Sequence, residues 1–412
     1  MRLSDYTWIA ISLIVAVAVM IFNRRRYGDH LTPVGIVFGV NLASLCCYHL
    51  KMLNFHNVHA QTHLIIFIGL AAFLSAGLFK LPRQLDRMRV VPVDLATLTP
   101  IFYGVVALSI CGWATSLFLM IGRHGLSYML ANTWVLGTEF QMQYVGYLNL
   151  FGILVLPMYV IRKVTRTARR IDLALAVLSL VGLLLAGIKQ YVIFTSACAV
   201  VAYAVLKPGR ISIRHALFGL VTILSFFVIY DTYIDLFVTH SFPESRFPPW
   251  LTFVERPYLY FTGSWPAMDR LVMDRVIEEP VFGYITLQPI LKILGDGLHL
   301  MEPVGRFLPA VEIGPQGYNV FSFFGEVYWD FGILGVTVVS FLVGWFASSL
   351  YLKAVTGGTW GFVLMYAIFA YGLVVSFFAY YYRFEMYILL SAVFVLAFVV
   401  APRLPEGGKH AV

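Results

Sequence analysis

Long apolar stretches recur along this 412-residue chain, and they constrain its fold more than any other feature. A bilayer core about 30 Å thick is crossed by about 20 apolar residues in a helix, because a helix satisfies its backbone hydrogen bonds within one segment. The chain is 60% hydrophobic and 12% charged, whereas soluble domains carry about 25% charged residues. These values exclude a water-soluble globule and predict an all-α, polytopic transmembrane helical bundle.

The apolar runs indicate about eleven spans with one long polar insertion between the eighth and the ninth. The runs cover residues 7–22, 33–50, 63–80, 98–121, 144–161, 171–188, 191–206, 216–234, 320–352, 360–380 and 384–401. We therefore expect three parts. They are an N-terminal bundle of about eight spans in 1–234, a large loop subdomain in 235–319, and a C-terminal bundle of about three spans with a short tail in 320–412.

Every second connection between the apolar runs is rich in arginine and lysine. These residues are Arg24, Arg25 and Arg26; Arg83, Arg87 and Arg89; Arg162, Lys163, Arg166, Arg169 and Arg170; and Lys207, Arg210 and Arg214. The positive-inside rule assigns these connections to the cytoplasm, so the N-terminus and the insertion face outward and the C-terminus faces inward. The net charge of +8 then reports orientation in the membrane and does not indicate a nucleic-acid surface.

Two segments on the predicted outer side carry a family resemblance. Residues 318–344 read YNVFSFFGEVYWDFGILGVTVVSFLVG, and residues 256–271 read RPYLYFTGSWPAMDRL. With the expected spans and the late outer loop, the chain resembles the Wzy-type polymerases of O-antigen and oligosaccharide repeat units. Arg306 and Gly317 match the Arg-x10-Gly pattern of some of these polymerases, and Lys189 stands where the family often has arginine.

The resemblance implies a glycosyltransferase of the bacterial inner membrane, with a fold similar to the membrane-embedded, lipid-dependent transferases. It implies transfer of a growing glycan from undecaprenyl pyrophosphate to the terminal sugar of a lipid-linked repeat unit at the periplasmic face. The expected partners are this lipid-linked oligosaccharide, membrane lipids and a chain-length regulator of the Wzz type. We expect no cofactor and no metal.

Basic side chains on the predicted outer side suit a pyrophosphate leaving group. Arginine binds phosphate oxygens through parallel charge-assisted hydrogen bonds. The candidates for this role are Lys189, Arg256, Arg270, Arg275 and Arg306. The alternative is that these arginines pair with nearby carboxylates such as Asp269 and Asp274, or with lipid headgroups.

The attacking hydroxyl needs a base, and Glu326 and His299 are the candidates. Carboxylates at membrane depth are costly and often functional, and imidazole titrates closest to neutrality. Glu326 has an alternative reading as a helix-start carboxylate satisfied by backbone amides, and we favour such a structural role for Asp330.

Three histidines of an outer connection form a further pattern. His56, His59 and His63 have a spacing compatible with a helix and with metal binding. A polar loop is the favoured reading, because no fixed carboxylate or cysteine lies nearby in sequence.

Aromatic residues of the two outer segments suit sugar rings. Tyr260 and Tyr328 are candidates for stacking on sugar faces, and Asn319 is a candidate for binding in the same segment. The alternative for the aromatic residues is an interfacial belt, which is a common use of tyrosine and tryptophan in membrane proteins.

Two other functions, and a purely structural role in an envelope complex, remain open at the level of sequence. An O-antigen ligase would use the same chemistry but transfer the glycan to lipid A core. A flippase or transporter of lipid-linked oligosaccharide belongs to a different class, which typically shows internal repeats and polar residues near the membrane midplane. Here the ionisable residues crowd at one face and the middles of the spans carry few of them, which favours an enzyme that works at one face.

Overall fold

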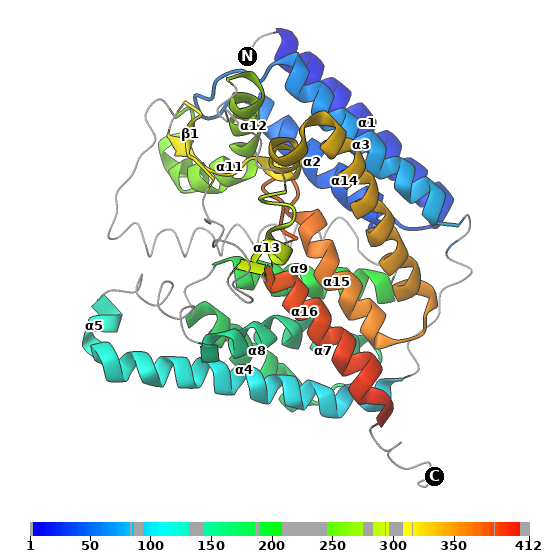
Figure 1. Ribbon diagram of the computed structural model, residues 1–412, viewed down its shortest axis with the longest axis vertical. Coiled ribbons are helices and arrows are strands. Elements are labelled where there is room, and N and C mark those ends of the chain that lie inside the picture. The colour runs from blue at the N-terminus through cyan, green and yellow to red at the C-terminus, as the bar shows by residue number, and fades with distance from the viewer. Residues whose placement is uncertain are drawn as a thin grey trace. The chain divides into compact units, whose positions relative to one another are not determined.

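The computed structural model describes residues 3–82, 85, 94–131, 144–185, 189–207, 245–274, 283–292, 294–295, 308–314, 316–382 and 384–403. Within these residues the chain is predominantly helical, and the strands are confined to one antiparallel pair, β1 (Val311–Glu312) and β2 (Gly317–Tyr318). Figure 1 shows the helices. The all-α prediction is confirmed.

Four of the described helices are long and apolar enough to cross a membrane. They are α1 (Leu3–Tyr27), α3 (Ala60–Lys80), α4 (Leu95–His124) and α14 (Ser322–Thr356). Shorter apolar helices are α2 (Pro33–His49), α9 (Lys189–Leu206), α15 (Trp360–Val374) and α16 (Phe384–Phe394) with η5 (Val395–Val400). The chain therefore has the character of a membrane protein. The number of eleven spans stays a prediction, and the run at 216–234 lies outside the described residues.

The remaining described elements are shorter. They are α5 (Leu126–Ala131), η2 (Tyr144–Phe151), α7 (Gly152–Val164), α8 (Arg170–Leu185), η3 (Pro249–Val254), α11 (Glu255–Thr262), α12 (Ser264–Met273), α13 (Gln288–Lys292) and η6 (Ala401–Arg403). The chain divides into two compact units that are each discontinuous in sequence. Unit 1 is Met1–Asp86, Ile211–Ser349 and Gly372–Phe384, and unit 2 is Arg87–Arg210, Leu350–Tyr371 and Glu385–Val412.

Unit 2 contains a buried ion pair between α7 and α8. Nη2 of Arg162 lies 2.9 Å from Oδ2 of Asp172, and both side chains are buried. The hydroxyl of Tyr103 on α4 donates to Oδ1 of the same carboxylate at 2.8 Å. Arg162, one of the arginines of a predicted cytoplasmic connection, is thus part of a contact that joins α4, α7 and α8 through Asp172.

Unit 1 is built on close contact between α3 and α14. A Cβ added at Gly69 would lie 2.5 Å from a ring atom of Phe324, and one added at Gly344 would lie 3.1 Å from Cβ of Ala76. The order of these contacts along both helices shows that α3 and α14 run in the same direction. Side chains near the start of α1, the end of α2 and the start of α3 also meet. We call this end of unit 1, where α1, α3 and α14 begin and α2 ends, the upper end (Figure 1).

The described part of the insertion packs against the upper end. The hydroxyl of Tyr258 on α11 donates to the Cys47 carbonyl at 2.6 Å and accepts from the Met52 N–H at 3.2 Å. Trp265 on α12 is fully buried, and its indole N–H donates to the Ser44 hydroxyl at 2.7 Å. These contacts hold α11 and α12 on the end of α2.

The predicted span at 360–380 is shorter in the structure, because α15 ends at Val374. The next residues turn back toward the start of α14. There the carbonyls of Phe378 and Ser376 accept from the N–H groups of Ser322 at 2.9 Å and Phe323 at 2.8 Å. The first N–H groups of a helix have no partner within the helix, so this turn satisfies two groups that would otherwise be orphaned.

A backbone break interrupts α14 at Gly332, where φ is 64° and ψ is −159°. This region of backbone space is essentially restricted to glycine, because a Cβ would clash with the backbone of its own residue. An added Cβ at Gly332 would meet no other atom within 4 Å. The backbone alone therefore requires glycine here.

We predict that Gly332→Ala lowers the free energy of unfolding by about 1–3 kcal/mol. The matched control is Gly39→Ala on α2, where an added Cβ also meets nothing within 4 Å but the backbone is helical. Its stability should stay the same or rise slightly. Thermal unfolding of both variants in detergent checks this, and equal effects would contradict it.

Candidate functional site

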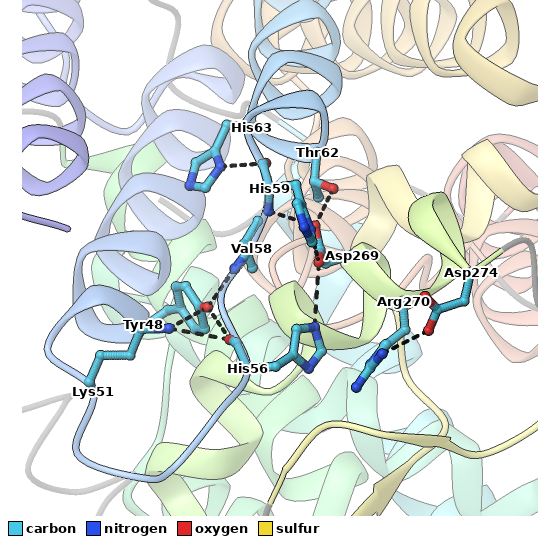
Figure 2. Close-up of polar contacts among 10 residues, drawn as sticks. All are labelled: Tyr48, Lys51, His56, Val58, His59, Thr62, His63, Asp269, Arg270 and Asp274. Carbon is cyan, nitrogen blue, oxygen red and sulfur yellow. Dashed lines mark hydrogen bonds and ion pairs between the residues drawn. The ribbon is translucent and has the colours of Figure 1, made fainter. Parts of the chain in front are cut away.

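The carboxylate of Asp269 on α12 is the centre of a polar cluster at the upper end of unit 1. Its Oδ1 accepts from the His59 backbone N–H at 2.8 Å and from the Thr62 hydroxyl at 2.6 Å. Its Oδ2 lies 2.9 Å from Nδ1 of His59 and 3.5 Å from Nε2 of His56. Figure 2 shows the rings of both histidines directed toward this carboxylate, which is 1% exposed.

Local sequence explains why a carboxylate belongs here. His59 is the N-cap residue of α3, and its own side chain does not cap the helix. The start of a helix carries unpaired N–H groups and partial positive charge, which favour an anion. Asp269 supplies that anion from another part of the chain.

The same carboxylate orients the His59 ring. A carboxylate accepts hydrogen bonds, so Nδ1 of His59 carries the proton that it donates to Asp269. Nε2 then holds the lone pair of the neutral ring, and within the described residues it makes no hydrogen bond. The side chain is 57% exposed. A carboxylate that fixes one ring nitrogen and leaves the other as an accessible base is the arrangement used in general base catalysis.

The connection before His59 is held in place by Tyr48. Its hydroxyl donates to the His56 carbonyl at 2.6 Å and accepts from the Val58 N–H at 3.0 Å. Nζ of Lys51 donates to the same hydroxyl and to the His56 carbonyl. Figure 2 shows these contacts below the start of α3. The backbone around His59 is therefore held by Tyr48, at His56 and Val58, and by Asp269, at the His59 N–H.

The hydrogen bonds to Asp269 also set its charge. Burial by itself raises the pKa of this carboxyl, but contacts with His56, Thr62 and His59 outweigh burial and lower the pKa from the usual 3.8 to about 2. Asp269 is therefore ionised at neutral pH.

Glu326 lies in the first turns of α14 and is fully buried. Its Oε2 accepts from the Tyr380 backbone N–H at 3.1 Å. This contact gives one carboxylate oxygen a backbone amide partner, and it ties α14 to the turn after α15. Asp330 accepts from the backbone N–H groups of Ile285, at 3.1 Å and 3.2 Å, and Thr286, at 2.7 Å, and from the Thr286 hydroxyl, which is the structural role favoured for it.

Two of the predicted arginines are described, and both are half-buried. Arg256 lies on α11. Arg270 lies on α12 directly after Asp269, and its Nη1 donates to Asp274 at 2.9 Å across one helical turn. This pair is one of those that the alternative reading of the arginines names, and both of its side chains are more than 40% exposed.

The predicted sugar-binding residues also lie in unit 1. Tyr260 on α11 is 38% exposed and contacts Phe378 edge-on, with ring centroids 5.9 Å apart. Asn319 follows β2 and is exposed, and Tyr328 on α14 is half-buried. Tyr260 and Glu326 thus contact the same turn after α15, while Tyr328 follows Glu326 by two residues on α14.

Arg275, His299 and Arg306 lie outside the described residues, and so does the side chain of Lys189 at the start of α9. Their predicted roles stay predictions.

No group of three or more His, Cys, Asp or Glu side chains among the described residues is placed to hold a metal ion. The three histidines singled out for a metal direct their rings to different partners. His56 and His59 contact Asp269, and His63 contacts His49.

The described residues also form a cavity of about 500 Å³, lined by Val17, Met20, Ile21, Arg24, Arg25 and His30. It lies toward the other end of α1, far along the helix from the Asp269 cluster. The Asp269 cluster is the candidate site, because it brings a buried carboxylate together with the imidazoles of His56 and His59.

Comparison with known proteins gives no relative. No family model, curated protein or solved structure matches the chain.

We predict that Asp269→Asn destabilises the protein by about 2 kcal/mol at pH 5 and above, since the folded carboxyl has a pKa about two units below its unfolded value. A lowered folded pKa gives stability that is complete above about pH 5 and is lost progressively as the pH falls through the folded pKa of about 2. Unfolding of wild type should show this loss, and Asp269→Asn should not.

The control for this prediction is Asp274→Asn, which removes an exposed ion pair and should cost at most about 1 kcal/mol. An Asp269→Asn variant as stable as this control at pH 5 would contradict the prediction.

Proposed function

We propose that this protein is a polysaccharide polymerase of the inner membrane. It transfers a growing glycan from undecaprenyl pyrophosphate to the terminal sugar of a lipid-linked repeat unit at the periplasmic face. The proposal rests on the Wzy-type resemblance of residues 256–271 and 318–344. The observation that supports it most is the Asp269–His59 pair, which presents an oriented, exposed imidazole beside one of these segments.

The transfer needs a base, and His59 has the geometry of one. The acceptor hydroxyl forms a new bond to the anomeric carbon of the donor glycan, and the bond from that carbon to the phosphate oxygen breaks. Nε2 of His59 takes the hydroxyl proton, while Asp269 stabilises the imidazolium that results. Undecaprenyl pyrophosphate leaves with the electron pair of the broken bond.

The leaving pyrophosphate gains negative charge, and α12 carries a cation next to the base. Arg270 adjoins Asp269 in sequence, and its exposed pair with Asp274 costs little to exchange for a phosphate oxygen. Arg256 on α11, together with Lys189, Arg275 and Arg306, completes the proposed set of cations. No metal is required in this scheme, because the arginines neutralise the developing charge.

Tyr260, Tyr328 and Asn319 are proposed to bind the sugars, and Glu326 and His299 remain the other candidates for the base. Glu326 is fully buried against a backbone N–H, which favours His59 over it. A chain-length regulator of the Wzz type is the proposed partner.

The experiment compares glycan ladders on gels from cells that lack the gene, complemented with wild type or variants at equal membrane levels. We expect deletion to leave single repeat units on lipid A core. His59→Gln should not restore the ladder, because loss of a general base costs about 10²–10⁴-fold in rate. Glu326→Gln should restore it, since the glutamine oxygen still accepts from Tyr380.

The matched control is His124→Gln, which changes a half-buried histidine of unit 2 and should restore the full ladder. Long chains that stay on their lipid carrier in the deletion strain would favour the ligase instead. An unchanged ladder in that strain would contradict both functions. Full restoration by His59→Gln with failure of Glu326→Gln would move the base to Glu326.

A further inference from the structure

A second set of titratable side chains lies inside the upper end of unit 1, and the proposed transfer does not use it. Asp5 on α1, His49 at the end of α2 and His63 on α3 form a row. Nδ1 of His49 lies 3.0 Å from Oδ1 of Asp5, and Nε2 of His49 lies 3.1 Å from Nε2 of His63. Nδ1 of His63 lies 2.9 Å from the His59 carbonyl, and Figure 2 marks this contact with a dashed line.

All three side chains of the row are buried. Their exposed fractions are 5% for Asp5, 2% for His49 and none for His63. Charge is costly to bury, so buried ionisable groups are usually paired with one another or neutralised by a proton.

The number of protons on the row follows from the direction of its hydrogen bonds. A carbonyl oxygen only accepts, so Nδ1 of His63 must donate to His59. One further proton must lie between the two Nε2 atoms, and another between Nδ1 of His49 and Asp5. Three hydrogen bonds thus require three protons.

Two neutral imidazoles and an ionised carboxylate supply only two protons. If the row holds only two protons, either the His49–Asp5 contact at 3.0 Å or the His49–His63 contact at 3.1 Å brings two lone pairs together in a buried site, which is unfavourable. With three, every contact is a hydrogen bond, and the row as a whole carries no net charge. A neutral row is favoured where charge is costly to bury.

Two aromatic rings hold the imidazoles in place. The Trp8 ring stacks on His63 with centroids 4.0 Å apart, and the Tyr48 ring meets His49 edge-on at 4.9 Å. Among the described residues, charged groups that act on the two histidines of the row include Lys51, from the connection after α2, and Asp269, from α12. Their charges are opposite, so they partly cancel at the row.

A metal ion between the two Nε2 atoms is the other way to avoid facing lone pairs. Metal sites in proteins normally use three or four side-chain ligands. Among the described residues no third His, Cys, Asp or Glu joins this pair to form such a group. A hydrogen bond fits the distance of 3.1 Å without further ligands.

We propose that Asp5, His49 and His63 form a proton-binding site that holds one proton beyond those of two neutral imidazoles and a carboxylate. This proton links α1 to α2 and α3, so its release on raising the pH loosens α1. The site does not depend on the proposed polymerase function.

The test measures protonation of the full-length protein in lipid nanodiscs at pH 7. Infrared spectra report a protonated carboxyl, and ¹⁵N-histidine NMR spectra report an imidazolium ring. We expect one such group per row, seen either as a carboxylic acid band that Asp5→Asn removes or as an imidazolium signal that His49→Gln removes. His124→Gln should remove only the signals of His124 itself and leave the carboxylic acid band and the signals of His49 and His63 unchanged.

Stability against pH gives the second readout. Above the unfolded histidine pKa of about 6.5 the folded row holds a proton that the unfolded chain has given up, so in that range wild-type stability should fall as the pH rises, by up to about tenfold in the folded-to-unfolded ratio per pH unit. Asp5→Asn should fold and lose this dependence, since its amide donates permanently to His49.

Three results would overturn the proposal. The first is an ionised Asp5 with two neutral imidazoles in folded wild type at pH 7. The second is a metal bound in a one-to-one ratio that His63→Gln removes. The third is the same stability profile against pH in wild type and Asp5→Asn.

Discussion

The carboxylate of Asp269 joins two parts of the chain that are 207 residues apart at Thr62. It caps the start of α3 from outside and so determines where α12 lies at the upper end of unit 1. It also fixes the proton on Nδ1 of His59 and thereby leaves Nε2 as the basic nitrogen. The carboxylate of Asp269 thus both caps α3 and orients the His59 ring, so a substitution of Asp269 changes both.

Hydropathy predicts the long helices well, because apolar length is what a membrane span requires. The run at 98–121 corresponds to α4, and the run at 320–352 corresponds to α14. The prediction fails where apolar residues leave the helix. Phe377 and Phe378 continue the hydropathy of α15, but their segment turns to pair with the start of α14. Hydropathy does not report that the N–H groups of Ser322 and Phe323 need these carbonyl partners.

The candidate site was only partly predictable for a different reason. The sequence offers both Asp269 and Asp274 as partners for the arginines, and the structure pairs Arg270 with Asp274 and Asp269 with His59. His59 and His63 have a helical spacing that suggests a shared ligand, yet the helix starts between them and sends the rings to different partners. Contacts between distant segments leave no periodic signal. The apolar run begins only at residue 63, whereas α3 begins at Ala60 without a side-chain cap from His59, so hydropathy gives no sign that an anion is needed there.

The most direct measurement of the central claim uses purified protein in liposomes with undecaprenyl-pyrophosphate-linked single repeat units as the sole substrate. The account predicts chains of two or more repeats, with one undecaprenyl pyrophosphate released for each new linkage. It also predicts a rate for His59→Gln that is about 10²–10⁴-fold lower. Substrate that remains as single repeats with wild type, or equal rates for wild type and His59→Gln, would contradict it.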